Sequence, residues 1–127
     1  MADAVLDSSA VIAFLRGEPG AEAVAGILFG ALVSSVNLAE VVTKLIERGA
    51  TPEVASETVS GLPIEIAPAS KAAGLVAGLL HAKTRGRGVS LGDRFCLALA
   101  QETGLPVFTA DRAWAGLGLP LDIRLIR

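Results

Sequence analysis

The chain has 127 residues, 52% of them hydrophobic, and a formal net charge of −2 at pH 7. This length fits one domain with its own core, so residues 1–127 are predicted to form a single domain. The acidic balance excludes indiscriminate binding to polyanions, and the single cysteine, Cys96, excludes an internal disulfide framework.

The high mean hydropathy of +0.59 predicts a sheet covered on both faces, with apolar surface left over for a partner. The longest uncharged stretch, residues 23–39, is shorter than the about 20 residues of a membrane span. The amino-terminal residues show no basic region ahead of an apolar run, as a signal peptide would. We therefore expect a cytoplasmic protein without a membrane segment.

Short β-rich runs alternate with helical segments in the first half of the chain. The run "AVLD" (residues 4–7) predicts a strand that ends in a carboxylate, followed by a helix up to Gly17. A helix is expected over residues 19–28, a buried strand in "ALVSSV" (31–36), and a helix from Asn37 that ends at Gly49.

The second half continues the alternation. Thr51 and Pro52 predict a helix start, and "PIEIAP" (63–68) predicts a short strand near a sheet edge. The remaining expected elements are a helix over 70–84 capped by Ser70, a loop "RGRGV" (85–89), a helix from Ser90, a strand in "PVFTA" and a last strand in "DIRLIR". This pattern predicts an α/β fold, a three-layer α/β/α sandwich with a mainly parallel central sheet of about five strands.

Four carboxylates are expected at the carboxyl-terminal edge of this sheet, where ligands bind in open α/β folds. Asp7 ends the first strand, Glu40 lies in the first turn of a helix, Asp93 begins another helix, and Asp111 follows the strand "PVFT". Clustered carboxylates repel unless a cation compensates their charge, and oxygen ligands suit Mg²⁺. Such a site can activate water and stabilise charge in a phosphoryl displacement, with one metal or two.

Local structure offers a second explanation for three of these acids. Asn37 with Glu40, and Ser90 with Asp93, have the spacing of capping boxes, and Asp111 can cap the helix that follows it. Asp7 is harder to explain in this way, because a carboxylate after a buried strand is costly unless it is paired or bound to metal.

The segments "VLDSSAVIAFLRGE", "NLAEV", "SLGDRFCLALA" and "TADRAW" occur in the order of the four acidic motifs of PIN-domain ribonucleases. As a set they resemble the VapC-type toxins of bacterial toxin–antitoxin pairs. The resemblance implies that Asp7, Glu40, Asp93 and Asp111 form the catalytic cluster, with Asp7 and Asp93 as direct ligands of Mg²⁺, or of Mn²⁺ in its place. It further implies endonucleolytic cleavage of RNA, a homodimer and a cognate antitoxin protein.

Small polar residues beside the acids fit a supporting role. Ser9 is placed to orient Asp7 or a water, and Thr109 to do the same for Asp111, as hydroxyls around metal sites do. Ser9 also fits the N-cap of the helix that follows, and Asn37 fits a cap better than a site residue.

The concentrated basic patch of the sequence comprises Lys83, Arg85, Arg87 and Arg94. We predict that it contacts the RNA backbone beside the metal, although a solvated loop ahead of a helix has the same pattern. Arg94 has a further alternative, as a counter-charge to the acidic cluster. The small-residue segment "AAGLVAGLL" (72–80) is the candidate dimer surface.

Two other functions remain open from the residues alone. One is an RNA-binding module that does not cleave. The other is an aspartyl-phosphate phosphatase with Asp7 as nucleophile, although Ser9 stands where such enzymes carry a second acid.

Overall fold

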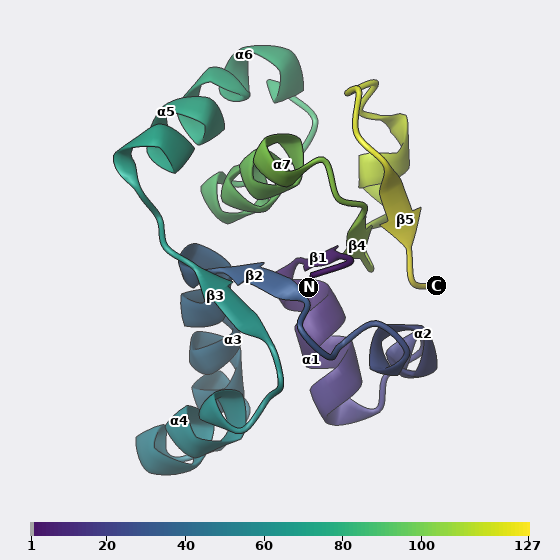
Figure 1. Ribbon diagram of the computed structural model, residues 1–127. Helices are drawn as coiled ribbons and strands as arrows, with labels where there is room; N and C mark the ends of the chain where they lie inside the picture. Colours follow the sequence, from purple (N-terminus) through teal and green to yellow (C-terminus); the bar gives the residue numbers. More distant parts are fainter. Residues whose placement is uncertain (1) are drawn as a thin grey trace.

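A five-stranded sheet with the order β3-β2-β1-β4-β5 forms the centre of the computed structural model, which describes residues 2–127 (Figure 1). The strands are β1 (Val5–Leu6), β2 (Leu32–Ser34), β3 (Glu65–Ala67), β4 (Val107–Thr109) and β5 (Ile123–Leu125). All four neighbouring pairs are parallel. The predicted parallel sheet is therefore confirmed, and β3 lies at an edge as expected.

Helices cover both faces of the sheet (Figure 1). One layer contains α1 (Ser8–Arg16), α2 (Ala21–Ala25), α3 (Ser35–Glu47) and α4 (Pro52–Ser60). The other contains α5 (Lys71–Leu79), α6 (His81–Thr84) and α7 (Leu91–Thr103), and the short 3₁₀ helix η1 (Arg112–Gly116) precedes β5. This arrangement confirms the three-layer α/β/α fold.

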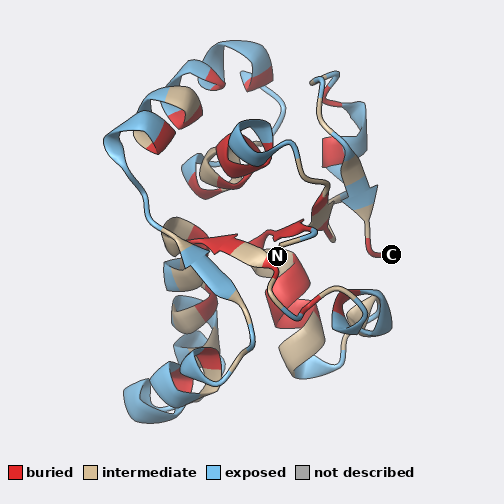
Figure 2. Cartoon of the chain, viewed as in Figure 1, coloured by how far each residue is buried: buried red, intermediate tan, exposed pale blue. Residues whose placement is uncertain are grey.

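Each face of the sheet has its own buried core. Neighbouring strand residues point to opposite faces, so Leu6 packs with Val11 of α1 and Val5 packs with Leu97 of α7. Figure 2 shows the central strands and the helix surfaces that face them as buried. The expected coverage of both sheet faces is confirmed, and it accounts for much of the high hydropathy.

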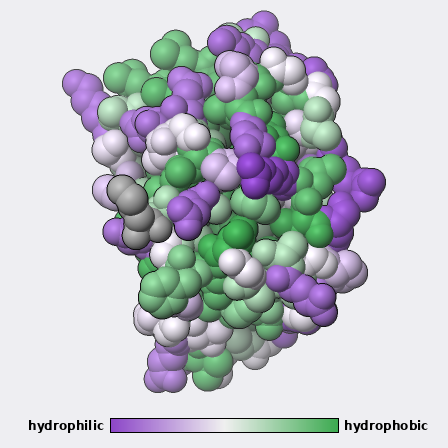
Figure 3. Space-filling model, turned by 45° about the vertical axis from the view of Figure 1, so that its right-hand side comes forward, coloured by the Kyte–Doolittle hydropathy of each residue, from purple (hydrophilic) through white to green (hydrophobic). Residues whose placement is uncertain are grey.

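Some large apolar side chains nevertheless remain exposed. They include Phe29 (88% exposed), Leu79 (74%), Leu75 (60%), Leu91 (55%) and Val54 (52%). On the face seen in Figure 3, hydrophobic surface is divided by hydrophilic side chains. None of the helices formed by residues 2–127 combines the length and the apolar character that crossing a membrane requires.

Three helices differ from the expected boundaries. The helix expected from Asn37 begins at Ser35, because Ser34 caps it, so the strand expected over 31–36 ends at Ser34 and Glu40 lies beyond the first turn of the helix. The helix expected over residues 19–28 is limited to α2, because Gly20 adopts a left-handed conformation with φ of 96° just before it. The helix expected over 70–84 is divided at Leu80, where the chain turns and buries the side chains of Leu80 and Thr84. The expected caps Thr51, Ser70 and Ser90 are all confirmed.

Candidate active site

Asp7 is held at the junction of β1 and α1, where its side chain caps the helix. Its Oδ1 accepts hydrogen bonds from Ala10 N (2.9 Å) and Ser9 Oγ (2.7 Å), and its Oδ2 accepts one from Thr109 Oγ1 (2.5 Å). Because Asp7 is the N-cap, the alternative of Ser9 as cap is wrong. The carboxylate is only 4% exposed, so its position is set by the surrounding donors.

Burial raises the pKa of Asp7 to about 6. The hydrogen bonds from Thr109, Ser9 and Ala10 lower the pKa, whereas the negative charge of Asp93 raises it further. The site thus disfavours the ionised carboxylate when no cation is present. A cation beside Asp7 would remove this penalty.

The hydroxyls of Ser9 and Thr109 connect Asp7 to the end of β4. Ser9 Oγ accepts a hydrogen bond from Ala110 N (2.9 Å), and Thr109 Oγ1 accepts one from Asp111 N (3.0 Å). Asp111 caps η1, its Oδ1 accepting from Ala113 N (3.0 Å). Thr109, expected to orient Asp111, thus holds the carboxylate of Asp7 and contacts Asp111 through its backbone N–H. The role of both hydroxyls in catalysis stays a prediction.

Asp93 forms a complete capping box at the start of α7. Its Oδ2 accepts from Ser90 N (2.9 Å), while Ser90 Oγ accepts from Asp93 N (3.1 Å). Burial raises the pKa of Asp93 most, the bonds to Ser90 lower it, and the charges of Glu40 and Asp111 raise it. Asp93 is thus the third helical residue of the capping box, and the charges of Glu40 and Asp111 act on its carboxylate.

The amide of Asn37 binds Glu40 to the backbone of α7, a contact that sequence reasoning missed. Ser34 caps α3, so the expected cap at Asn37 is wrong. Asn37 is buried inside the helix and its Nδ2 donates to Glu40 Oε1 (2.8 Å) and to Gly92 O (3.1 Å). Asn37 therefore positions Glu40 against the start of α7.

Gly92 provides the room for this contact and was also missed. A Cβ at this position would lie 2.7 Å from Glu40 Cδ and 2.9 Å from Oε1, closer than Cβ atoms approach other atoms. The signal in the sequence was a glycine directly before Asp93, inside a helix start where alanine is otherwise favoured.

The oxygens of this site suit a hard cation that keeps part of its water shell. Among residues 2–127, no three Asp, Glu, His or Cys side chains converge closely enough to hold a metal ion by themselves. Mg²⁺ commonly takes one or two protein carboxylates and fills its other positions with water. The buried Asp7 and the neighbouring Asp93 fit that requirement.

The predicted basic patch is divided between the surface and the protein interior. Lys83 and Arg85 are exposed, and Arg87, also exposed, donates to the carbonyl oxygen of Gly116. Arg94 is half-buried, and its Nη1 donates to Ala77 O of α5 (3.1 Å). No ion pair joins Arg94 to a carboxylate within residues 2–127, so the counter-charge alternative gains no support.

Solved structures of toxin–antitoxin systems share this fold. A toxin–antitoxin complex from Klebsiella pneumoniae aligns with a TM-score of 0.78 and 19% identity over 98% of both chains. DNA-bound VapBC from Salmonella typhimurium aligns with a TM-score of 0.76 and 20% identity over 100% of both chains.

A third similar structure is Mycobacterium tuberculosis VapC20, described as a sarcin–ricin loop-cleaving toxin. It aligns with a TM-score of 0.75 and 16% identity over 91% of this chain and 95% of that one. No curated protein matches the chain significantly by sequence. The sequence pattern of the PIN domain, however, matches residues 4–118. The chain therefore belongs to the PIN-domain family.

Proposed function

We propose that this protein is a Mg²⁺-dependent endoribonuclease, the toxin component of a toxin–antitoxin pair. The observation that carries the proposal is the buried Asp7 at the carboxyl end of β1, whose carboxylate is held by Ser9 and Thr109 with no basic side chain paired to it among residues 2–127. The match to the PIN domain and the structural similarity to toxins of toxin–antitoxin systems support the same conclusion. Mn²⁺ is expected to replace Mg²⁺, because both take carboxylate and water ligands.

Each acid has a proposed role in phosphodiester hydrolysis. Asp7 and Asp93 hold the metal, which when bound lowers the pKa of water and stabilises charge on the phosphoryl group. Glu40, held by Asn37 through Oε1, is placed to take a proton at Oε2 from the attacking water. Asp111 completes the cluster, and Ser9 and Thr109 keep Asp7 in place. Lys83, Arg85 and Arg87 are proposed to bind the RNA backbone.

The proposed partners are RNA, a cognate antitoxin protein and a second copy of the chain. Helix α5 exposes Leu75 and Leu79 beside small residues, which supports the segment 72–80 as the dimer surface. A monomer in sedimentation at micromolar concentration would contradict the homodimer. Several structural neighbours are toxin–antitoxin complexes, which supports an antitoxin as partner.

Cleavage of structured RNAs with Mg²⁺ or Mn²⁺, followed by sequencing of the new ends, tests this proposal. Asp7→Asn and Asp93→Asn should each lower the rate by more than about 100-fold, which exceeds the effect of residues that only orient a ligand. The matched control is Asp122→Asn, which removes an exposed carboxylate paired with Arg124. Cleavage that persists in EDTA or in both site variants would overturn the assignment.

The two other functions have less support. An aspartyl-phosphate enzyme carries a second acid two residues after its nucleophile, and that position is held here by Ser9, whose hydroxyl donates to Asp7 Oδ1. RNA recovered intact from a tight complex in Mg²⁺ would instead favour a binding module without cleavage.

A further inference from the structure

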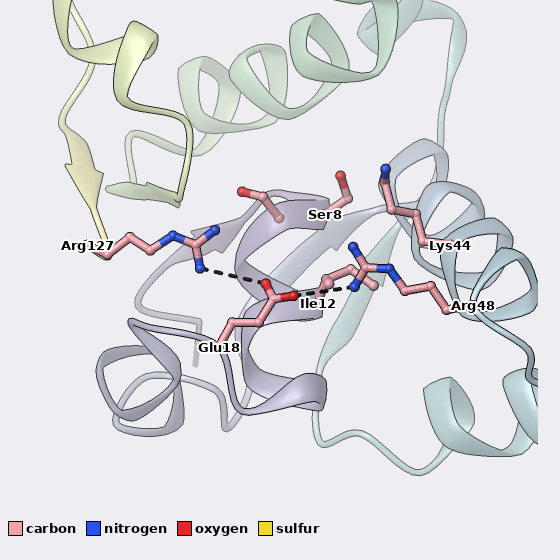
Figure 4. A pocket seen from close by; sticks show the side chains of 7 residues that line it. Ser8, Ile12, Glu18, Lys44, Arg48 and Arg127 are labelled. Carbon is pink, nitrogen blue, oxygen red and sulfur yellow. Dashed lines mark hydrogen bonds and ion pairs between the residues drawn. The ribbon is translucent and has the colours of Figure 1, made fainter.

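A small basic pocket lies beside the acidic site, between α1, α3 and the last residue of the chain (Figure 4). Its volume is about 200 Å³, and its polar lining includes Ser9, Glu18, Lys44, Arg48 and Arg127. Pockets for drug-sized ligands occupy about 300–1,000 Å³. This pocket therefore suits a small charged group better than a whole base or an organic cofactor.

Positive charge exceeds negative charge around Glu18. Its carboxylate is paired with Arg48 (3.3 Å), Arg127 (3.6 Å) and Arg16 (3.9 Å). Figure 4 shows Arg48 and Arg127 approaching Glu18 from opposite sides. The ammonium of Lys44 makes no ion pair or hydrogen bond with any other part of residues 2–127 that the structure describes. The pocket lining therefore has three cations, Lys44, Arg48 and Arg127, and one carboxylate, in a chain whose net charge is −2.

Stability alone does not account for this concentration of cations. The paired side chains are 29–43% exposed, and exposed ion pairs contribute about 0–1 kcal/mol each. Glu18 instead restrains the guanidinium groups of Arg48 and Arg127 at the pocket. Restrained guanidinium groups lose less conformational entropy when they bind an oxyanion.

The pocket is continuous with the acidic site through two elements. Ser9 lines the pocket and also donates to Asp7 Oδ1 (2.7 Å). On α3, Lys44 lies four residues and about 6 Å beyond Glu40 on the same helix face, and Arg48 is the C-cap four residues further along the chain. A ligand that extends from Asp7 and Glu40 along this face reaches the basic pocket.

We propose that this pocket binds a phosphate of the RNA strand next to the phosphate at the acidic site. The proposal rests on the proposed nuclease function, which supplies the polyanionic substrate. Lys44 and Arg48 make the contacts, because phosphates are bound by cationic side chains that position the strand without reading its sequence. The pocket thereby sets which bond of the strand lies at Asp7.

The salt dependence of RNA binding tests the pocket separately from cleavage. A fluorescent single-stranded RNA is titrated in EDTA at several salt concentrations, with wild type, Lys44→Gln and Lys44→Gln/Arg48→Gln. Each lost phosphate contact should reduce the slope of log Kobs against log salt by about 0.7. Lys44→Gln breaks no contact seen within residues 2–127, so loss of folding does not obscure the result.

The controls carry equal charge changes elsewhere. Lys71→Gln and Lys71→Gln/Arg124→Gln remove exposed cations that do not line the pocket and should leave the slope unchanged. With single-stranded DNA of the same length, Lys44→Gln should reduce the slope by the same amount as with RNA, because the contact is with phosphate. Equal slopes for Lys44→Gln and Lys71→Gln would overturn the proposal that the pocket binds a phosphate.

Cleavage in Mg²⁺ is measured on the same preparations. If wild type cleaves but the Lys44 variant keeps its slope, the pocket is wrong and the nuclease function stands. If the slope falls as expected but no protein cleaves, the nuclease function is wrong and the phosphate pocket stands. If the Lys44 variant keeps its slope but escapes inhibition by the cognate antitoxin, the pocket binds an acidic group of that protein, and the RNA proposal is overturned.

Discussion

At the residue scale, Asp7 combines a proposed functional role with a cost to stability. The carboxylate is almost fully buried, yet no basic side chain pairs with it among residues 2–127. Three hydrogen bonds offset only part of the desolvation, since the pKa is still raised to about 6. A residue of this kind lowers stability in the absence of metal and favours binding when metal is present.

The isosteric change Asp7→Asn should therefore stabilise the metal-free protein near neutral pH. The folded pKa of about 6 exceeds the unfolded value of 3.8, so the free energy of unfolding falls as pH rises from about 4 through 6. The difference of about 2 pKa units corresponds to at most about 3 kcal/mol.

Urea unfolding in EDTA at pH 4, 6 and 7.5 measures this effect. Wild type and Asp7→Asn should have similar stability at pH 4, and the variant should be more stable at pH 7.5. If Asp7→Asn is no more stable than wild type at pH 7.5, burial of the ionised Asp7 carboxylate does not lower the stability of the wild type.

Gly92 is the second residue whose role separates stability from activity. In Gly92→Ala the new Cβ would displace the Glu40 carboxylate, while alanine favours the helix by up to about 1 kcal/mol. We expect RNA cleavage to fall at least about tenfold with unchanged or slightly higher thermal stability.

Gly26→Ala is the matched control for this substitution. Gly26 is exposed, has helical φ and ψ, and a Cβ there would make only ordinary contacts of 3.7 and 3.9 Å. Its cleavage rate should equal that of wild type. Full activity in Gly92→Ala would show that the position of Glu40 against α7 is unimportant.

At the element scale, the first turn of α7 contains a capping box that includes a proposed metal ligand, Asp93. Ser90 and Asp93 satisfy each other's backbone N–H groups, and the carboxylate of Asp93 also lies near the charges of Glu40 and Asp111. Helix N-termini favour carboxylates through the helix dipole. The capping box therefore holds the Asp93 carboxylate where the charges of Glu40 and Asp111 act on it, as a consequence of how the helix begins.

Two substitutions in this turn should have opposite effects. Ser90→Ala removes the side-chain cap and should lower the free energy of unfolding by about 1 kcal/mol, with cleavage retained within a few-fold. Asp93→Asn keeps an oxygen that can accept from Ser90 N, so it should cost less stability but abolish cleavage. Thermal melts and cleavage rates of both variants measure these effects. Equal loss of activity in the two variants would show that Asp93 acts through the capping box and not as a metal ligand.

At the scale of the whole molecule, the parallel sheet brings distant acids to one edge. Asp7 follows β1, Asp111 follows β4, and these strands are direct neighbours in the sheet. Glu40 and Asp93 come from helices in opposite layers, α3 and α7, which meet at Asn37 and Gly92. The site thus depends on both layers and on the sheet between them.

Divalent metal should therefore stabilise the whole fold. At a concentration one hundred times Kd, a ligand that binds only the folded state contributes about 2.7 kcal/mol, a Tm increase of roughly 10 °C for a chain of this size. Scanning with Mg²⁺ or Mn²⁺ should show this increase for wild type and Asp122→Asn. An equal increase in Asp7→Asn would place the metal elsewhere.

Features that depend on neighbouring residues could be predicted from the sequence. The strands, the caps Thr51, Ser70 and Ser90, and the end of α1 at Gly17 follow from short-range hydrogen bonds and side-chain periodicity. The helix boundaries near Leu80 and Ala25 could not be predicted in this way. At Leu80 the reason is that burial of Leu80 and Thr84 depends on packing against other elements.

The sequence by itself determined the parallel α/β fold and the chain positions of the four acids, because both follow from local pattern and from the direction of parallel strands. Only the tertiary structure decided that Asn37, which binds Glu40, also binds the backbone of Gly92, a residue 55 positions from Asn37 in sequence. The same holds for the ion pairs of Glu18 with Arg48 and Arg127. Such contacts depend on how separate helices pack. No local hydrogen bond or periodicity along the chain encodes that packing.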